Sequence, residues 1–145
     1  MEDLNVTVEV LKNADELWTM ENAFLKAVGE VEMTLERFQR LAEAVKDETI
    51  IFFAARMNGT LIGLCSVSPC FSTFACKTSG VFDDFFIEQE HRGRGVARKL
   101  VNAVREWCQE RDWASLTVGC SQEDAGMYQS LGFDTALGVM LAANL

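Results

Sequence analysis

Residues 87–97 read Ile-Glu-Gln-Glu-His-Arg-Gly-Arg-Gly-Val-Ala and join an apolar, strand-like segment to a helical pattern that starts near Gly95. The first N–H groups of a helix lack intrahelical acceptors and form the positive end of its dipole. A phosphate group can therefore bind there through the backbone alone. The sequence predicts an anion site made by Arg92, Gly93, Arg94, Gly95, Val96, Ala97 and Arg98.

Charge is concentrated in the same place. Residues 91–99 carry four Lys or Arg and no acid, so they contribute +4 while the rest of the chain carries −13 of a net −9. The spacing fits neither a dinucleotide fingerprint, which would want Gly or Ala at position 98, nor a P-loop. One local anion site in an acidic protein is the simplest interpretation. The alternative is an ordinary glycine turn before a solvated, basic helix start.

The remaining pattern predicts a mixed α/β sheet. Strands are expected over residues 4–10, 49–56, 60–67, 81–87, 115–119 and 133–142, with a tight hairpin at Asn58-Gly59 and a loop over residues 69–78. Helices are expected after a capping box of Asn13 with Glu16, after caps at Thr34 and Ser121, and from Gly95 onward. The first should face inward through Leu17, Met20, Phe24 and Val28, and the second through Leu35, Phe38, Leu41, Ala42 and Val45.

Composition limits the class of protein. The chain of 145 residues fits one domain, residues 1–145, and no apolar run is long enough for a membrane span. No signal peptide is evident, which predicts a cytoplasmic location. Five Cys without a C-x-x-C pair and a single His argue against a disulfide framework or a metal site, and the Cys are expected to be mostly buried. The acidic net charge argues against nucleic-acid binding.

Arg92 to Ala97 resembles the R/Q-x-x-G-x-G/A pyrophosphate-binding motif of the GNAT N-acetyltransferases. The resemblance continues through residues 82–107, 115–119 and 127–133 in order and spacing. It implies a central, mostly antiparallel sheet of six to seven strands, splayed at a cofactor notch and flanked by about four helices. It also implies acetyl-CoA as cosubstrate.

The resemblance further implies how the cosubstrate is held. Pantetheine would lie in the notch like an added strand, on main-chain groups of Phe85, Phe86 and Ile87. The pyrophosphate would sit on the N–H groups of residues 93–98, and a backbone N–H near Phe85 or Phe86 would stabilise the oxyanion. Ser121, at a position where the family commonly has asparagine, would also contact the cofactor.

Tyr128 is the one tyrosine of the chain and falls where the family places its general acid. A tyrosine hydroxyl can protonate the thiolate expelled when an amine attacks a thioester. Asp124, one helical turn before Tyr128, departs from the family pattern by adding a charge where a small residue is usual. The alternative is a half-buried core tyrosine.

Asp83 and Asp84 interrupt an apolar strand. They are candidates to bind the substrate and to accept the proton of an attacking ammonium group. Asp83 to Ile87 looks most like the E-D-F-F-V segment of diamine N-acetyltransferases, with Asp83 at the position that faces the polyamine. A cationic acceptor such as a polyamine, an aminoglycoside or a lysine side chain would suit these acids. They could instead be exposed acids at a strand edge.

The sequence thus predicts an N-acetyltransferase that moves the acetyl group of acetyl-CoA to a primary amine by direct attack in a ternary complex. A catalytically idle acyl-CoA-binding or regulatory module is the main alternative, and a nucleic-acid-binding module is a weaker one. The predicted partner is a small-molecule amine, with no nucleic acid and no membrane. Many relatives form homodimers, and the sequence leaves the oligomeric state and the acceptor open.

Overall fold

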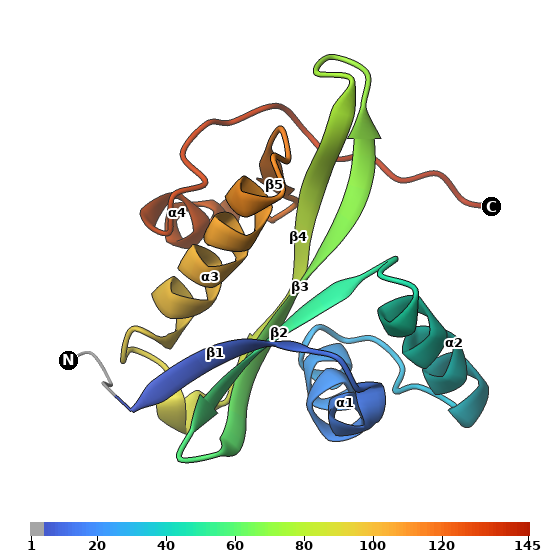
Figure 1. Cartoon of the computed structure of the whole chain (residues 1–145), viewed down its shortest axis with the longest axis vertical. Helices are drawn as coiled ribbons and strands as arrows, with labels where there is room; N and C mark the ends of the chain where they lie inside the picture. Colours follow the sequence, from blue (N-terminus) through green and yellow to red (C-terminus); the bar gives the residue numbers. More distant parts are fainter. Residues whose placement is uncertain (1–4) are drawn as a thin grey trace.

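The computed structural model describes residues 5–145, so Leu4, where the first strand was predicted to begin, lies outside the described residues. Residues 5–145 form five strands and four α-helices (Figure 1). The strands are β1 (Val6–Leu11), β2 (Ile51–Met57), β3 (Thr60–Ser72), β4 (Lys77–Ile87) and β5 (Leu116–Val118). The helices are α1 (Leu17–Ala27), α2 (Leu35–Lys46), α3 (Val96–Glu110) and α4 (Gln122–Ser130), with short 3-10 turns η1 (Ala14–Glu16) and η2 (Gln89–His91).

The strands form one mixed sheet in the order β1-β2-β3-β4-β5. Neighbours are antiparallel except for β4 and β5, which are parallel. The α+β architecture, the mostly antiparallel sheet and the four helices confirm the prediction. The expected six to seven strands are wrong, because the sheet over residues 5–145 has five.

The missing strand is the last one. Residues 133–145, predicted to hold a strand over 133–142, contain neither helix nor strand. Leu137, Val139 and Leu141 are exposed, so the apolar alternation buries nothing that would stabilise pairing. Gly138 also has a φ of 141°, outside the extended conformation of a strand.

The hairpin around Asn58-Gly59 is confirmed, with positive φ at both turn residues. The loop predicted over residues 69–78 is largely wrong, because β3 continues to Ser72 and β4 begins at Lys77. The paired register runs from Ser68 and Val81 out to Ser72 and Lys77, so backbone hydrogen bonds extend this hairpin where side-chain pattern gave no signal.

This long hairpin also explains why the prediction of mostly buried cysteines is wrong. Cys65 and Cys108 are buried, whereas Cys70, Cys76 and Cys120 are exposed. Cys70 lies in the outer part of β3 and Cys76 in the turn that leads to β4, and this end of the hairpin extends away from the helices, at the upper end of Figure 1. Cys120 lies in the turn before α4, where no element covers it.

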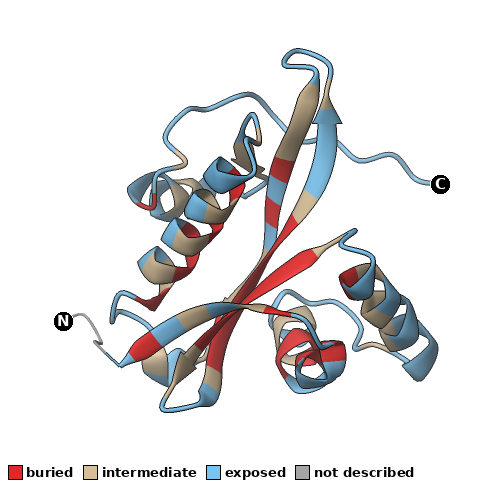
Figure 2. Ribbon diagram, in the orientation of Figure 1, coloured by how far each residue is buried: buried red, intermediate tan, exposed pale blue. Residues whose placement is uncertain are grey.

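Two apolar layers lie on opposite faces of the sheet (Figures 1 and 2). On one face α3 and α4 pack against Phe53, Cys65, Val67 and Phe82. On the other face α1 and α2 pack against Phe52, Ala54 and Leu64. Each face of a strand is reached by alternate residues, so the apolar run of β2 supplies both layers.

The two N-terminal helices are less buried than predicted. Val28 of the first and Leu35 of the second were expected to face inward, but they are 56% and 72% exposed. Val28 lies beyond the last residue of α1, and Leu35 occupies the first turn of α2, whose cap is Thr34 as predicted. Both residues therefore fall at helix ends that extend past the sheet.

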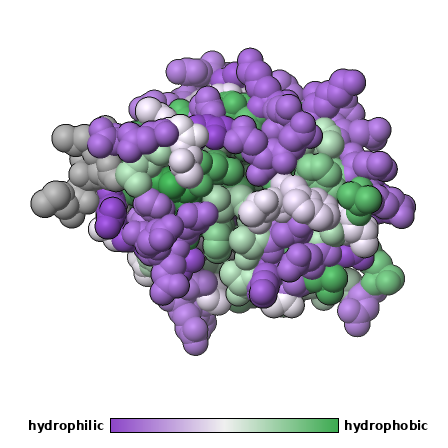
Figure 3. All heavy atoms as spheres, turned by 90° about the horizontal axis from the view of Figure 1, so that it is seen from below, coloured by the Kyte–Doolittle hydropathy of each residue, from purple (hydrophilic) through white to green (hydrophobic). Residues whose placement is uncertain are grey.

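Polar side chains surround a strip of apolar ones on the end of the molecule where β4 finishes (Figure 3). None of the helices within residues 5–145 combines the length and apolar character needed to cross a lipid bilayer.

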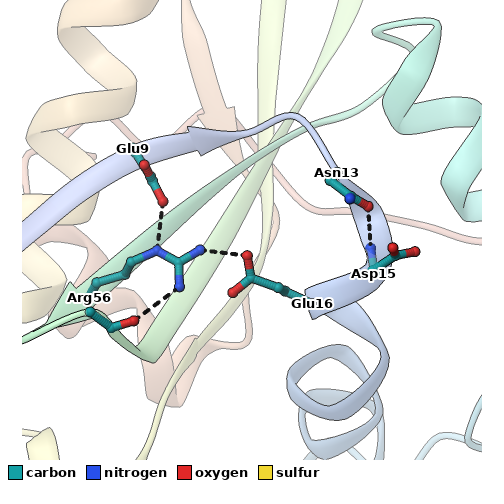
Figure 4. Close-up of polar contacts among 6 residues, drawn as sticks. Glu9, Asn13, Asp15, Glu16 and Arg56 are labelled. Carbon is teal, nitrogen blue, oxygen red and sulfur yellow. Dashed lines mark hydrogen bonds and ion pairs between the residues drawn. The ribbon is translucent and has the colours of Figure 1, made fainter.

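Arg56 ties the start of the chain to the sheet (Figure 4). Its Nε donates to Glu9 Oε1 of β1 at 2.6 Å and its second terminal nitrogen donates to Glu16 Oε1 at 2.8 Å. Glu16 was expected to close a capping box with Asn13, but Asn13 Oδ1 instead accepts from the N–H of Asp15 and caps η1. Glu16 does not complete the capping box because its carboxylate pairs with Arg56 instead.

Candidate active site

The edge of β4 becomes free halfway along the strand. β5 pairs with β4 at Gly80, Val81 and Phe82, and it ends at Val118. Among the described residues, no strand pairs with the outer edge of β4 over residues 83–87. Unpaired main-chain groups at such an edge can hydrogen-bond an extended ligand. This divergence is the geometry that the notch requires.

A β-bulge sits at the point of divergence. Ser66 of β3 is opposite Asp83, and Leu64 is opposite Phe86, so the register shifts between them. Asp84 has a φ of +51°, and its N–H donates to Asp83 Oδ1 at 2.8 Å. Bulges re-aim side chains, and here the bulge breaks the simple alternation between the two acids.

The bulge leaves the two acids in different surroundings. Asp83 is exposed. Asp84 is half-buried and accepts a hydrogen bond from Ser66 Oγ at 2.6 Å. Burial raises the pKa of the Asp84 carboxyl, whereas the hydrogen bonds that it accepts lower it. The interpretation of both as acids at an exposed strand edge therefore fails for Asp84.

The aromatic residues that follow point to both faces of the sheet. Phe85 packs in the layer under α3 and α4, and Phe86 packs against the layer under α1 and α2. Ile87 is buried, and its carbonyl oxygen accepts a hydrogen bond from Arg92 Nε at 2.8 Å. One of the main-chain acceptors predicted to hold pantetheine is thus already engaged by the turn.

The turn into α3 has an open helix N-terminus. Gly93 and Gly95 have φ of +74° and +84°, a region that favours glycine. Gly95 is the N-cap residue of α3 and makes no side-chain capping bond, whereas Thr34 and Ser121 cap α2 and α4 through their hydroxyl groups. The first N–H groups of α3 are left for another acceptor, which fits the predicted phosphate site.

The arginines of the turn differ in what they contact. Arg92 is held against Ile87 and over the ring of Phe86, 5.7 Å from its centroid. Arg98 donates to the carbonyl oxygen of Ser130 at 3.2 Å and so joins α3 to the end of α4. Arg94 is exposed and makes no hydrogen bond or ion pair within residues 5–145. Arg94 is therefore the arginine most available to an anion.

Tyr128 faces the free part of β4 from α4. Its ring lies 6.0 Å from that of Phe85 and 6.4 Å from that of Phe82, between centroids. Burial raises the pKa of the Tyr128 hydroxyl to about 12, and the charges of Asp124 and Asp83 act in the same direction. The hydroxyl is consequently protonated at neutral pH, as a proton donor must be.

Ser121 caps α4 by accepting a hydrogen bond from the N–H of Asp124 at 3.3 Å, as the sequence predicted. Asp124 is exposed. α4 is further fixed at its other end, where Arg105 donates to the carbonyl oxygen of Leu131 at 3.2 Å. Two arginines of α3 thus hold the last carbonyl groups around Tyr128, which sets the position of its helix.

An open hollow of about 650 Å³ lies on the α1 side of the same region. It is lined by Ala23 of α1, Phe86 of β4, and the acidic or polar side chains Glu88, Gln89 and Glu90. The end of β4, η2 and α1 thereby meet around this hollow.

Two residues of this region were not predicted from the sequence: Glu21 of α1 and Ser66 of β3. Both are buried, and both contact Asp84. A signal for Glu21 was present, because it stands four residues after Leu17 and three before Phe24, within the apolar face of the helix. Ser66 gave no signal, since a serine in an apolar strand is common.

Comparisons with known proteins agree with this geometry. Residues 14–133 match the model of the acetyltransferase (GNAT) family. No match was found among the curated proteins. Three similar solved structures cover nearly the whole chain and share its fold at low sequence identity.

The first is an aminoglycoside acetyltransferase from an uncultured soil metagenomic sample in complex with sisomicin, with a TM-score of 0.82, 13% identity, and coverage of 97% of this chain and 96% of that one. The second is glucosamine-6-phosphate N-acetyltransferase from Arabidopsis thaliana (0.79, 16%, 96% and 97%). The third is a predicted acetyltransferase with acetyl-CoA from Clostridium acetobutylicum (0.79, 16%, 96% and 96%).

The family model spans most of the chain, including the open helix N-terminus, the diverging strands and Tyr128. Acetyl-CoA as cosubstrate is supported by the family and by the acetyl-CoA complex of a neighbour. The chain belongs to the GNAT family of acetyltransferases.

Proposed function

We propose that this protein is an N-acetyltransferase that transfers the acetyl group of acetyl-CoA to a primary amine by direct attack in a ternary complex. The observation that carries the proposal is Tyr128, which faces the free edge of β4 with a hydroxyl whose pKa is raised to about 12. A buried, protonated hydroxyl beside this edge suits protonation of a leaving thiolate.

The cosubstrate contacts follow from the free edge and the open helix. Main-chain groups of Phe85 and Phe86 hold pantetheine, and the N–H groups of residues 93–98 with Arg94 hold the pyrophosphate. A backbone N–H near Phe85 or Phe86 stabilises the oxyanion. Ser121, at the start of α4, contacts the cosubstrate beside its role as helix cap.

The acceptor is a cationic amine bound by the acids of β4. Asp83 is exposed and Asp84 half-buried at the bulge, and Glu88 and Glu90 line the adjoining hollow. This group of acids favours an ammonium group over a neutral or acidic amine. Polyamines, as in the diamine N-acetyltransferases, and aminoglycosides, as named for one structural neighbour, are the two acceptor types that we favour.

The test is acetyl-CoA binding together with thiol release over a panel of amines that includes spermidine, sisomicin, glucosamine 6-phosphate and glycine. We expect binding, thiol release with the cationic members, and the fastest release with a diamine or aminoglycoside. Tyr128→Phe should lower turnover by about 100-fold while acetyl-CoA binding stays unchanged. A preference for glycine would contradict the cationic acceptor.

A catalytically idle acyl-CoA-binding module is the second candidate. It would bind acetyl-CoA and release no thiol with any amine of the panel. The hydroxyl group of Tyr128 argues against this candidate. The ring already packs on the aromatic side chains of Phe82, Phe85 and Phe133, and this packing does not need a hydroxyl. A phenylalanine would fill the same space.

A further inference from the structure

A glutamate is buried on the sheet-facing side of α1. Glu21 is 4% exposed, beside the apolar side chains of Leu17 and Met20. Within the described part of the chain, its Oε2 is buried and receives no hydrogen bond from a donor. An ionised carboxylate without a donor is costly in such a place, so it needs a proton or a cation.

The neighbour that Glu21 does have is another acid. The carboxyl groups of Glu21 and Asp84 lie within hydrogen-bonding reach across the gap between α1 and β4. Two ionised carboxylates have only acceptors, so a hydrogen bond between them exists only when one of them carries a proton. A proton on Glu21 supplies the missing donor and explains the isolated Oε2.

The surroundings decide which partner holds the proton. Burial, then the negative charge of Asp84, raises the pKa of Glu21 to about 9. Asp84 accepts from Ser66 Oγ as well as from Glu21, and both hydrogen bonds lower its pKa against the effect of burial. We therefore place the shared proton on Glu21, the more buried of the two, and the negative charge on Asp84.

That charge is not balanced nearby. The other titratable groups that act on the pair are Asp83 of β4, next to both carboxyl groups, and Cys65 of β3, beside Asp84. Neither Glu21 nor Asp84 forms an ion pair with Lys, Arg or His in residues 5–145. A half-buried carboxylate in this setting attracts the ammonium group of a substrate.

We propose that Asp84 accepts the proton of the acceptor's ammonium group, and that Glu21 is a positioning residue that donates its carboxyl proton to Asp84. An N–H bond of the ammonium breaks and an O–H bond forms on Asp84. The freed electron pair of the amine forms the bond to the acetyl carbon as the C–S bond breaks, and the sulfur takes its proton from Tyr128. The Tyr128 phenolate then takes the second N–H proton, which leaves a neutral amide, and the proton on Asp84 passes to solvent. This inference rests on the proposed function.

Asp84 is preferred to Asp83 because of how each is held. Asp83 is exposed, and one of its oxygens already accepts the N–H of Asp84. Asp84 is fixed by the bulge, by Ser66 and by Glu21, so its carboxylate keeps one orientation. A proton acceptor needs such a fixed position.

The shared proton is tested first without any acceptor. Carboxyl ¹³C resonances of the free protein are followed against pH by NMR, with Glu21→Gln used to assign Glu21. We expect Glu21 to titrate at or above neutral pH, and Asp84→Asn to move that titration down. Titration of Glu21 together with the exposed carboxyls, below about pH 5, would overturn the shared proton.

The role in catalysis is tested by the pH dependence of kcat/KM with the amine of the panel that releases thiol fastest. Glu21→Leu removes the donor to Asp84 and should move the acid limb up by about one pH unit. Glu21→Gln keeps an N–H donor and should leave that limb in place. Asp84→Asn should remove the limb and lower kcat by about 100-fold.

The outcomes separate this inference from the proposed function. Thiol release whose acid limb is the same in wild type and Glu21→Leu overturns the positioning role of Glu21, although the enzyme is then an acetyltransferase. An acid limb that persists in Asp84→Asn and disappears in Asp83→Asn assigns the proton acceptor to Asp83 instead. Absence of thiol release from wild type overturns both proposals, whatever the NMR titration gives.

Discussion

The two faces of the sheet are built on different principles. The face under α3 and α4 is a continuous apolar layer that includes Phe82, Leu100 and Val104. The face under α1 and α2 is smaller and encloses Glu21 and Ser66 beside its apolar residues. One face stabilises the fold and presents an open helix end, whereas the other carries buried polar groups that cost stability.

We infer that the two faces serve different steps of the proposed reaction. The proposed anion site lies at the start of α3, where no charge need be buried, because backbone N–H groups and an exposed arginine would suffice. Proton transfer needs a carboxylate with limited access to water, and this can be built only where a helix covers the sheet. The predictions below test this difference.

The largest expected effect comes from truncating the matched phenylalanines of the two faces. Phe82→Ala and Phe52→Ala remove side chains that are each 1% exposed, so each should lower the free energy of unfolding by roughly 3–5 kcal/mol. Phe82 also supports Phe85 and Tyr128, so only Phe82→Ala should reduce turnover strongly. Urea unfolding and thiol release below both melting temperatures check this, and equal losses of turnover would break the comparison.

A charge at the open helix end should abolish cosubstrate binding. Gly95→Asp places a side chain at a φ of +84° and a negative charge at the positive end of α3, so acetyl-CoA affinity should fall by about 50-fold or more. Gly29→Asp is the matched control, since Gly29 has a φ of +81° at the end of α1 with open space around it. Calorimetric titration with acetyl-CoA measures both, and similar losses would place the anion site elsewhere.

The buried acid should make stability depend on pH. An unfolded glutamate releases its proton near pH 4.5, whereas burial raises the pKa of Glu21 to about 9 in the folded protein. The stability that Glu21 contributes is therefore fully present below about pH 4.5 and declines as the pH rises toward 9.

Glu21→Gln should remove this decline and stabilise the protein at pH 8, relative to pH 5, by on the order of 1–3 kcal/mol. Glu43→Gln on the exposed surface of α2 serves as control and should keep the wild-type profile. Denaturant unfolding from pH 5 to 9 gives the comparison. A profile of Glu21→Gln that matches wild type would show that Glu21 is ionised in the folded protein.

The smallest effect concerns Tyr128, the one tyrosine of the chain, whose ionisation can be followed directly by ultraviolet absorbance. Asp124→Asn removes a charge that raises the pKa of Tyr128, so the titration midpoint should fall by a few tenths of a pH unit. Added salt should reduce the difference, because Asp124 is exposed. A midpoint near 10 in wild type would mean that the hydroxyl is not buried.

The features that could be predicted from the sequence differ between these regions. The Asn58-Gly59 hairpin and the caps at Thr34 and Ser121 were predicted because each depends on a few adjacent residues. The strand expected over residues 133–142 was wrong, because a strand forms only where a partner pairs with it. The extra length of β3 and β4 was missed for the same reason.

By itself, the sequence determined the order of the elements from β1 to α4, the position of Tyr128 on a helix after the fifth strand, and the arginine-glycine turn that marks the family. Only the tertiary structure decided that β4 bulges at Asp84, that β5 leaves β4 after Phe82, and that Glu21 meets Asp84. Local motifs follow from the conformational preferences of neighbouring residues. A contact between residues 21 and 84 instead depends on how a helix packs on a sheet, and that is set by the summed burial of both apolar layers.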